Sequence, residues 1–257
     1  MKRIPHILLS TLIGAMTLVC HARQSGDALT VERRSLPGAD TVSGIDLTEP
    51  FHTTAKWQFV IRQDPLGKDQ LPGPLHFCFV KDETPRCSDS EFNALVTSVI
   101  VHPTPASGGA LLTVVADLET LGSGGPRATI IWAYNAHSDQ FDRVFDSSVR
   151  RQNNGEIRII TNGPLAGDIV MDRAGQRAPY RYDISVYRLA NSRYTEVLNY
   201  SGNSKYNDGN PIPVIDAEMP EIERRLNLWR PGDPLPTPER TQCKGLEMRH
   251  GVEWCEQ

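Results

Sequence analysis

The chain has 257 residues and a formal net charge of −4. Acidic and basic residues are interspersed without a basic stripe, which argues against nucleic-acid binding. A chain of this length buries a large core by itself, so we expect neither a structural metal nor a cofactor.

The first 22 residues have the layout of a secretory signal peptide. Lys2 and Arg3 form a positive start, an apolar run over residues 4–19 follows, and Ala22 precedes the expected cleavage site. The run is too short and too weakly apolar for a membrane span, and no later stretch suits one. We therefore predict a periplasmic or secreted protein. Cleavage removes two basic residues and no acid, which leaves a net charge of −6.

Cys20 offers a second interpretation, in which cleavage precedes a cysteine that then carries lipid. Lipoprotein signals usually have Leu at position −3 and a small residue at −1, where this chain has Thr17 and Val19. The pattern favours cleavage after Ala22. A lipid anchor on Cys20 is therefore disfavoured.

The cysteines beyond the signal peptide form an even set, which in an exported chain indicates disulfides. They are Cys78, Cys87, Cys243 and Cys255. Four cysteines allow three pairings, and proximity favours Cys78–Cys87 and Cys243–Cys255. Neither pair has the C-x-x-C spacing of redox or metal sites. We expect structural bridges and no metal site.

The chain divides by composition into three parts after residue 22. Residues 23–50 are polar and form a lead-in. Residues 51–228 alternate short runs rich in Val, Ile, Thr and aromatics with turn signals such as GSGGP and NDGN. This pattern predicts a mainly β domain built as an antiparallel meander. Residues 229–257 form a Pro-rich tether and a disulfide-closed C-terminal loop, which could fold back on the body.

Two short helices are predicted within this β-rich chain. Ser88 and Glu91 have capping-box spacing, and apolar residues follow at helical spacing over Phe92–Val99. The run LVTSVIV is rich in β-branched residues, so a strand is the alternative for the later half. The second helix begins near Met219 and Pro220, because proline suits the first helical turn.

An internal repeat relates two segments, residues 130–145 and 183–198, at a shift of 53 residues. The aligned pairs are Tyr134 with Tyr187, Phe141 with Tyr194, and Val144 with Val197. Each unit has the order strand, loop, strand, six-residue turn, strand. We expect the two aromatics beside the turn to pack across it.

This unit resembles one blade of a β-propeller, most nearly the FG-GAP type found in exported proteins. The resemblance covers roughly residues 110–215 and implies propeller-like meanders. FG-GAP blades usually carry a D-x-D-x-D-G calcium loop, which is absent here, so calcium binding is not implied. The alternative is that two ordinary hairpins share alternation and an aromatic residue.

Motifs that carry catalysis are absent from the sequence. It contains no HExxH, G-x-S-x-G, Walker or G-x-G-x-x-G motif, so no catalytic residue is assigned. Candidate binding residues are Gly163, Pro164 and Gly167, where the loop GPLAGD bends tightly and forms either a binding edge or a plain turn. Tyr180 and Tyr182 share one predicted sheet face, where they either grip a sugar or protein or pack in the core.

The densest acidic cluster is IDAEMPEIE, which includes Asp216 and Glu218. It is either the carboxylate pair of an envelope glycan hydrolase or a set of acids that stabilise a helix dipole, and the second is favoured. The predicted function is a non-enzymatic exported binding protein for a protein or cell-wall glycan of the envelope. A concrete version is an inhibitor of, or immunity protein against, a cell-wall hydrolase. A structural envelope component is a further alternative.

Overall fold

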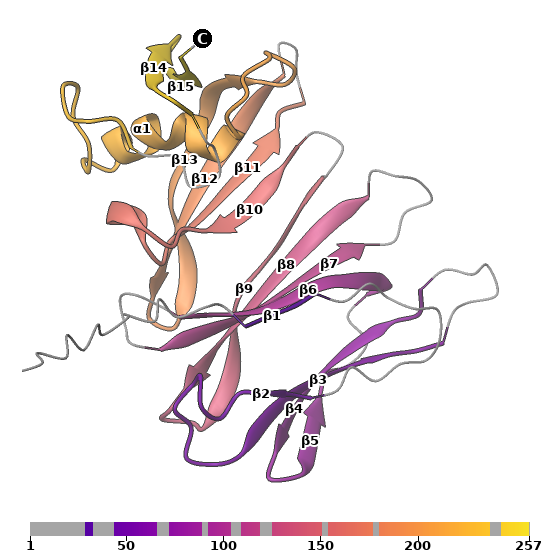
Figure 1. Cartoon of the computed structure of the whole chain (residues 1–257). Coiled ribbons are helices and arrows are strands. Elements are labelled where there is room, and N and C mark those ends of the chain that lie inside the picture. The colour runs from indigo at the N-terminus through magenta and orange to yellow at the C-terminus, as the bar shows by residue number, and fades with distance from the viewer. Residues whose placement is uncertain are drawn as a thin grey trace, which may run out of the picture.

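The computed structural model describes residues 29–32, 44–65, 72–88, 92–103, 109–118, 125–150, 154–176, 180–236 and 243–256. The predicted signal peptide and Cys20 lie outside these residues. The described chain is mainly β, with antiparallel sheets and one α-helix, which confirms the predicted class. Apart from the first strand, which joins the second sheet, three sheets, the helix and a final hairpin follow one another in chain order (Figure 1).

The first sheet is a four-stranded meander in the order β2-β3-β4-β5. Its strands are β2 (Ile45–Asp46), β3 (Trp57–Gln63), β4 (Leu75–Lys81) and β5 (Thr84–Cys87). Cys78 and Cys87 lie opposite each other in the register of β4 and β5. A disulfide between them closes this hairpin, and a second bridge joins Cys243 to Cys255. Both pairings are the predicted ones.

The second sheet has the order β1-β6-β7-β8-β9. Its strands are β1 (Leu29–Glu32), β6 (Ala94–Pro103), β7 (Ala110–Leu118), β8 (Pro126–Asn135) and β9 (Gln140–Arg150). β1 adds to the edge strand β6, so the polar lead-in contributes both β1 and β2 to sheets.

The central strand β7 of the second sheet is buried on both faces. Leu112 and Val114 of β7 pack against the first sheet in a core that includes Phe59 and Phe77. Leu111, on the opposite face of β7, packs against the third sheet. Burial on both sides explains why strand β7 is almost continuously apolar instead of alternating.

The third sheet has the order β10-β11-β12-β13 and is covered by the helix. Its strands are β10 (Glu156–Ile159), β11 (Ile169–Ala174), β12 (Arg181–Ala190) and β13 (Arg193–Lys205). Helix α1 (Val214–Arg225) packs on this sheet, and Ile222 and Leu226 contribute to the shared core. The hairpin of β14 (Leu246–Arg249) and β15 (Val252–Cys255) packs against the far side of α1, so the C-terminal loop does fold back.

Both helix predictions need correction. The run after Phe92 forms strand β6, because its β-branched side chains favour a pleated, buried surface. Glu91 lies outside the described residues. Helix α1 begins at Val214 behind Pro213, and Pro220 lies in its interior, where it removes a backbone hydrogen bond. Both Pro213 and Pro220 suit the start of a helix, and the sequence pattern favoured Pro220.

The two repeat units share a topology but not a residue-by-residue register. Strands β7–β9 and β11–β13 are both three-stranded meanders. Tyr134 lies opposite Phe141, with ring centroids 5.3 Å apart, as expected. In the second unit a two-residue turn places Tyr187 opposite Glu196 instead of Tyr194. The described strands form no closed barrel or propeller.

Candidate functional site: an acidic pocket beside helix α1

The face of the third sheet that meets α1 carries a buried charged group. Arg158 of β10 is buried and donates hydrogen bonds to two carboxylates, Glu156 (Nη2 to Oε2, 2.8 Å) and Asp216 of α1 (Nη1 to Oδ1, 2.8 Å). Burial lowers the pKa of Arg158, but the hydrogen bonds to Glu156 and Asp216 outweigh it and the net shift is upward. The guanidinium is therefore a fixed cation between sheet and helix.

Buried acids outnumber this cation. Glu253 of β15 is 0% exposed, and neither of its carboxyl oxygens has a hydrogen-bond partner among the described residues. Burial, and then the charges of Asp216 and Glu223, raise the pKa of Glu253 to about 8. Burial also raises the pKa of Asp172 to about 8 and, to a smaller extent, the pKa of Glu223. The surroundings of α1, on the sheet side and on the hairpin side, are therefore rich in desolvated carboxyl groups.

Part of these surroundings opens into a cavity of about 470 Å³, which we name the acidic pocket. It is lined by Ile160, Asn162, Gly163, Pro164, Leu165, Asp216, Met219, Glu223, Pro234 and Pro236. A single 3-10 turn (Gly163–Leu165) forms one wall, and the two prolines of the segment after α1 belong to another. Carboxylates and apolar side chains thus share one lining.

Glu223 is the most informative residue of the acidic pocket. It is 7% exposed and lines the cavity, and burial raises the pKa of its carboxyl group. Glu223 lies seven residues after Asp216, so the two side chains share one face of the helix. A largely buried carboxylate is costly unless it is paired, so a ligand that brings a cation into the cavity would stabilise it.

Glu218 does not belong to this group. It lies two residues after Asp216, which places it on another side of the helix. Its carboxylate accepts hydrogen bonds from the Tyr200 hydroxyl (2.9 Å) and the Ser204 N–H (2.6 Å). A Cβ at Gly202 would lie 2.7 Å from Glu218 Oε1, so any larger residue there would displace this carboxylate. Asp216 and Glu218 therefore do not form the carboxylate pair that a hydrolase would need.

The predicted binding residues separate in the structure. Gly163 and Pro164 line the acidic pocket, whereas Gly167 lies outside its lining and bonds Ile160 and Tyr194. Tyr180 precedes β12 and is 51% exposed. Tyr182 is 2% exposed and packs in the core under α1. The two tyrosines do not form one exposed face.

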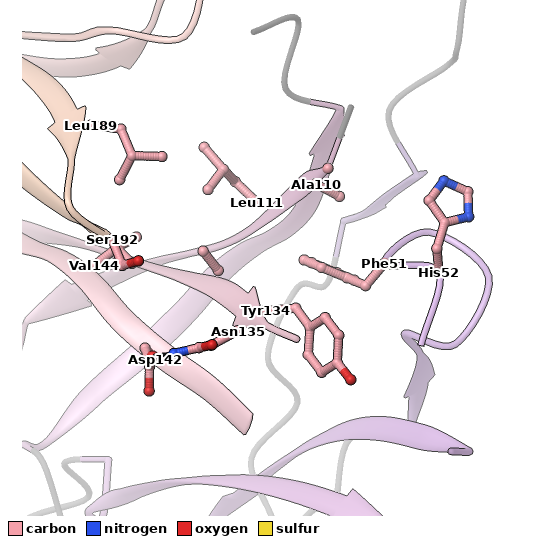
Figure 2. Close-up of a pocket in the computed structure, with 12 residues that line it drawn as sticks. Phe51, His52, Ala110, Leu111, Tyr134, Asn135, Asp142, Val144, Leu189 and Ser192 are labelled. Atoms are coloured by element: carbon pink, nitrogen blue, oxygen red, sulfur yellow. Dashed lines mark hydrogen bonds between the residues drawn. The ribbon is translucent and has the colours of Figure 1, made fainter. Parts of the chain in front are cut away.

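A smaller cavity of about 290 Å³ lies near the strand ends where the three sheets meet (Figure 2). Leu111, Val144 and Leu189 form its apolar part. Asn135 and Asp142 on its border are hydrogen-bonded to each other at 2.9 Å. Among the described residues of its lining, none carries a fully buried polar atom without a partner, so this cavity gives a weaker indication of a ligand.

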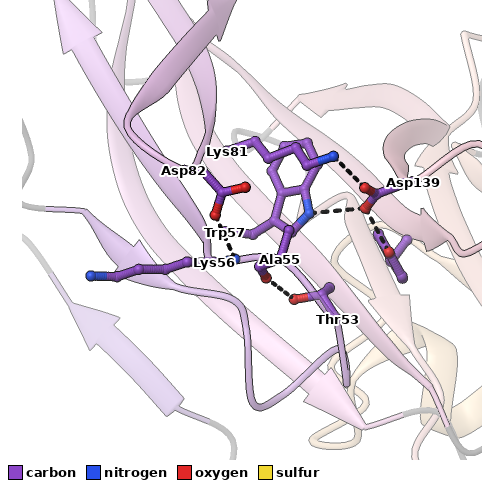
Figure 3. A network of polar contacts seen from close by, with 8 residues as sticks. Thr53, Ala55, Lys56, Trp57, Lys81, Asp82 and Asp139 are labelled. Carbon is purple, nitrogen blue, oxygen red and sulfur yellow. Dashed lines mark hydrogen bonds and ion pairs between the residues drawn. The ribbon is translucent and has the colours of Figure 1, made fainter.

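A polar network joins the first and second sheets (Figure 3). Asp139, in the turn between β8 and β9, accepts hydrogen bonds from Trp57 Nε1 (3.1 Å), the Tyr134 hydroxyl (2.7 Å) and the Lys81 ammonium. The Lys81 contact is the main reason that the pKa of Asp139 falls to about 2. Every group in this network has a partner, so we assign it a structural role.

Further site classes have no support in the described part of the chain. Within it, no group of three His, Cys, Asp or Glu side chains is arranged to hold a metal ion. The one α-helix there is too short and too polar to span a bilayer. Comparison of the chain with protein-family models, curated proteins and solved structures returned no match.

Proposed function

We propose that the protein is an exported binding protein whose acidic pocket receives a basic side chain of a partner protein in the cell envelope. The observation that carries the proposal is Glu223, a buried carboxyl group that lines the cavity and whose pKa burial raises. The two predicted disulfides support an oxidising compartment.

The charge balance of the pocket favours a cationic group. Asp216, Glu223 and Glu253 interact electrostatically, whereas Arg158 is the cation bonded to Asp216. An ammonium or guanidinium group that enters the cavity would give Glu223 an ion pair and hydrogen bonds in a desolvated setting. A neutral or anionic group would leave the carboxylate uncompensated.

The shape and lining of the pocket fit the rest of such a side chain. Ile160, Leu165 and Met219 are apolar and would contact the methylene stem of a lysine or arginine. The volume of about 470 Å³ lies within the range of known ligand cavities. A single long basic side chain and its flanking backbone therefore suit the site.

The concrete version is an inhibitor of, or immunity protein against, a cell-wall hydrolase with a basic surface. A net charge of −6 after signal cleavage would accelerate encounter with a basic partner. The glycan-hydrolase alternative has less support, because Glu218 is engaged with Tyr200 and Ser204. An inhibitor or immunity protein would bind a partner protein, whereas a hydrolase would turn over a glycan, so the two roles are distinguished by a binding assay.

The first test compares two capped tripeptides that differ only in the terminal ammonium group, acetyl-Gly-Lys-Gly-amide and acetyl-Gly-norleucine-Gly-amide. Titrations followed by amide NMR shifts should show binding of the lysine peptide near α1 and little binding of the norleucine peptide. Glu223→Gln should lower the affinity for the lysine peptide about tenfold, since it removes one charged contact.

The matched control is Glu221→Gln. Glu221 lies on the same helix, but its carboxylate pairs with Arg224 and Arg225 and does not line the pocket. This variant carries the same charge change and should bind the lysine peptide like the wild type. Equal binding of the two peptides, or equal loss in both variants, would refute the proposal.

A further inference from the structure

The face of the second sheet that meets the third sheet changes from apolar side chains to hydroxyl groups along its strands. At one end of the strands, Leu111, Ile131 and Phe145 pack against the third sheet in a shared apolar core. Farther along β6, β7 and β8 the same face presents hydroxyl groups instead. They belong to Ser98, Thr113 and Thr129.

This change separates the two sheets, because a hydroxylated surface gains little from close apolar packing. Figure 1 shows the strands of the second and third sheets fanning apart. The space between them is a cavity of about 580 Å³, which we name the wedge. Its opposite wall is the edge strand β10 with the preceding residues Asn154 and Gly155.

The wedge contains a polar group that the described chain leaves unsatisfied. Thr113 is 4% exposed, lines the cavity, and its hydroxyl has no hydrogen-bond partner. Thr97, in contrast, lines the same cavity but donates its hydroxyl hydrogen to the carbonyl of Val115 at 3.1 Å. Buried hydroxyls are normally bonded, so the Thr113 hydroxyl indicates an external partner.

The charged groups around the wedge are compensated within the protein. Arg127 pairs with Asp117 at 2.8 Å, and Arg158 pairs with Glu156 and Asp216. Burial lowers the pKa of His102, which favours its neutral form. The lining therefore combines neutral donors and acceptors with apolar side chains such as Ile100, Val115 and Ile157.

We propose that the wedge is a second binding site, distinct from the acidic pocket, and that its ligand is a neutral oligosaccharide. Sugar hydroxyls both donate and accept hydrogen bonds, as the threonine and serine hydroxyls of the wall require. The C–H faces of sugar rings match the valine and isoleucine side chains. Strand β10 separates the two sites, with Ile157 and Ile159 toward the wedge and Arg158 toward the helix.

The probes are chitotriose and maltotriose, titrated into the full mature chain and followed by amide NMR shifts. We expect at least one of them to shift amides of β6, β7 and β10. Thr113→Val keeps the side-chain volume and removes the hydroxyl, so it should weaken binding about fivefold, the equivalent of one hydrogen bond. If this variant does not fold, Ser98→Ala tests the same wall.

The matched control is Ser204→Ala, which removes another buried hydroxyl without a partner, on β13 and outside the wedge. It should leave glycan binding unchanged, as should Glu223→Gln of the acidic pocket. Two results would overturn the inference: no shift of wedge amides by either sugar at millimolar concentration, or equal affinity of Thr113→Val and the wild type. Neither result bears on the lysine peptide.

Discussion

Replacement of Glu253 by glutamine is expected to remove much of the pH dependence of folding. The buried carboxyl group has a pKa of about 8 in the folded chain, against an ordinary value of 4.5. Between these pH values the folded state holds a proton that the unfolded state releases. The free energy of unfolding therefore falls as the pH rises from 4.5 to about 8. The stabilisation that comes from the protonated Glu253 is fully present only below about pH 4.5.

The magnitude follows from one proton. A single proton of difference changes the free energy of unfolding by about 1.4 kcal/mol per pH unit. Glutamine has the shape of the protonated acid and does not ionise, so Glu253→Gln should match the wild type below about pH 4. It should be about 1 kcal/mol more stable than the wild type at pH 5.5 and about 4 kcal/mol more stable at pH 7.5. Asp172, whose pKa is also about 8, supplies the slope that is left.

The assay is urea denaturation followed by tryptophan fluorescence at several pH values from 5.5 to 7.5. Glu221→Gln is the control, because ion pairs with Arg224 and Arg225 lower the pKa of Glu221 and keep it charged over this range. Its slope with pH should equal that of the wild type. If Glu253→Gln also kept the wild-type slope, the assignment of a proton to Glu253 would be wrong.

Three other variants test the internal contacts. Arg158→Met leaves Asp216 buried without its cation and should lower the free energy of unfolding in urea by about 3–5 kcal/mol. Adding Asp216→Asn should recover part of this loss. A loss below about 1 kcal/mol would contradict the buried ion pair. Asp139→Asn should lower the melting temperature at pH 7. The difference from the wild type should vanish as the pH falls through about 2, where the wild-type carboxylate is protonated. Identical melting temperatures at pH 7 would show that the network in Figure 3 does not stabilise the fold. Replacement of both Cys78 and Cys87 by serine should cost about 2–3 kcal/mol in urea denaturation, and dithiothreitol, which also reduces the Cys243–Cys255 bridge, should cost the wild type at least as much.

The fold class could be predicted because short β-rich runs and turn signals dominate the chain. The predicted helix after Ser88 shows the limit of this argument. Phe92, Leu95, Val96 and Val99 fit a helical period, yet the last three lie in strand β6, where Val99 is buried in the core and Leu95 is exposed. A strand that is covered on both faces loses its period of two, so periodicity alone cannot distinguish it from a buried helix.

The site was visible in parts but not as a whole. Gly163, Pro164 and Asp216 each stood out by residue type, but their meeting depends on α1 folding over the third sheet. Glu253 was missed, although an acid between Val252 and Trp254 in a short apolar strand was a usable signal. Thr113 carried no signal, because threonine is common in strands of every kind.

The order of the layers has a consequence for how the molecule opens. Each layer packs mainly on its neighbours in the chain, from the first sheet through the second and third to α1 and the C-terminal hairpin. In such quasi-linear stacks, fraying starts at an outer layer and moves inward. Amide hydrogen exchange should therefore be slowest in β7 and β8, which have protein on both sides, and progressively faster toward the two ends.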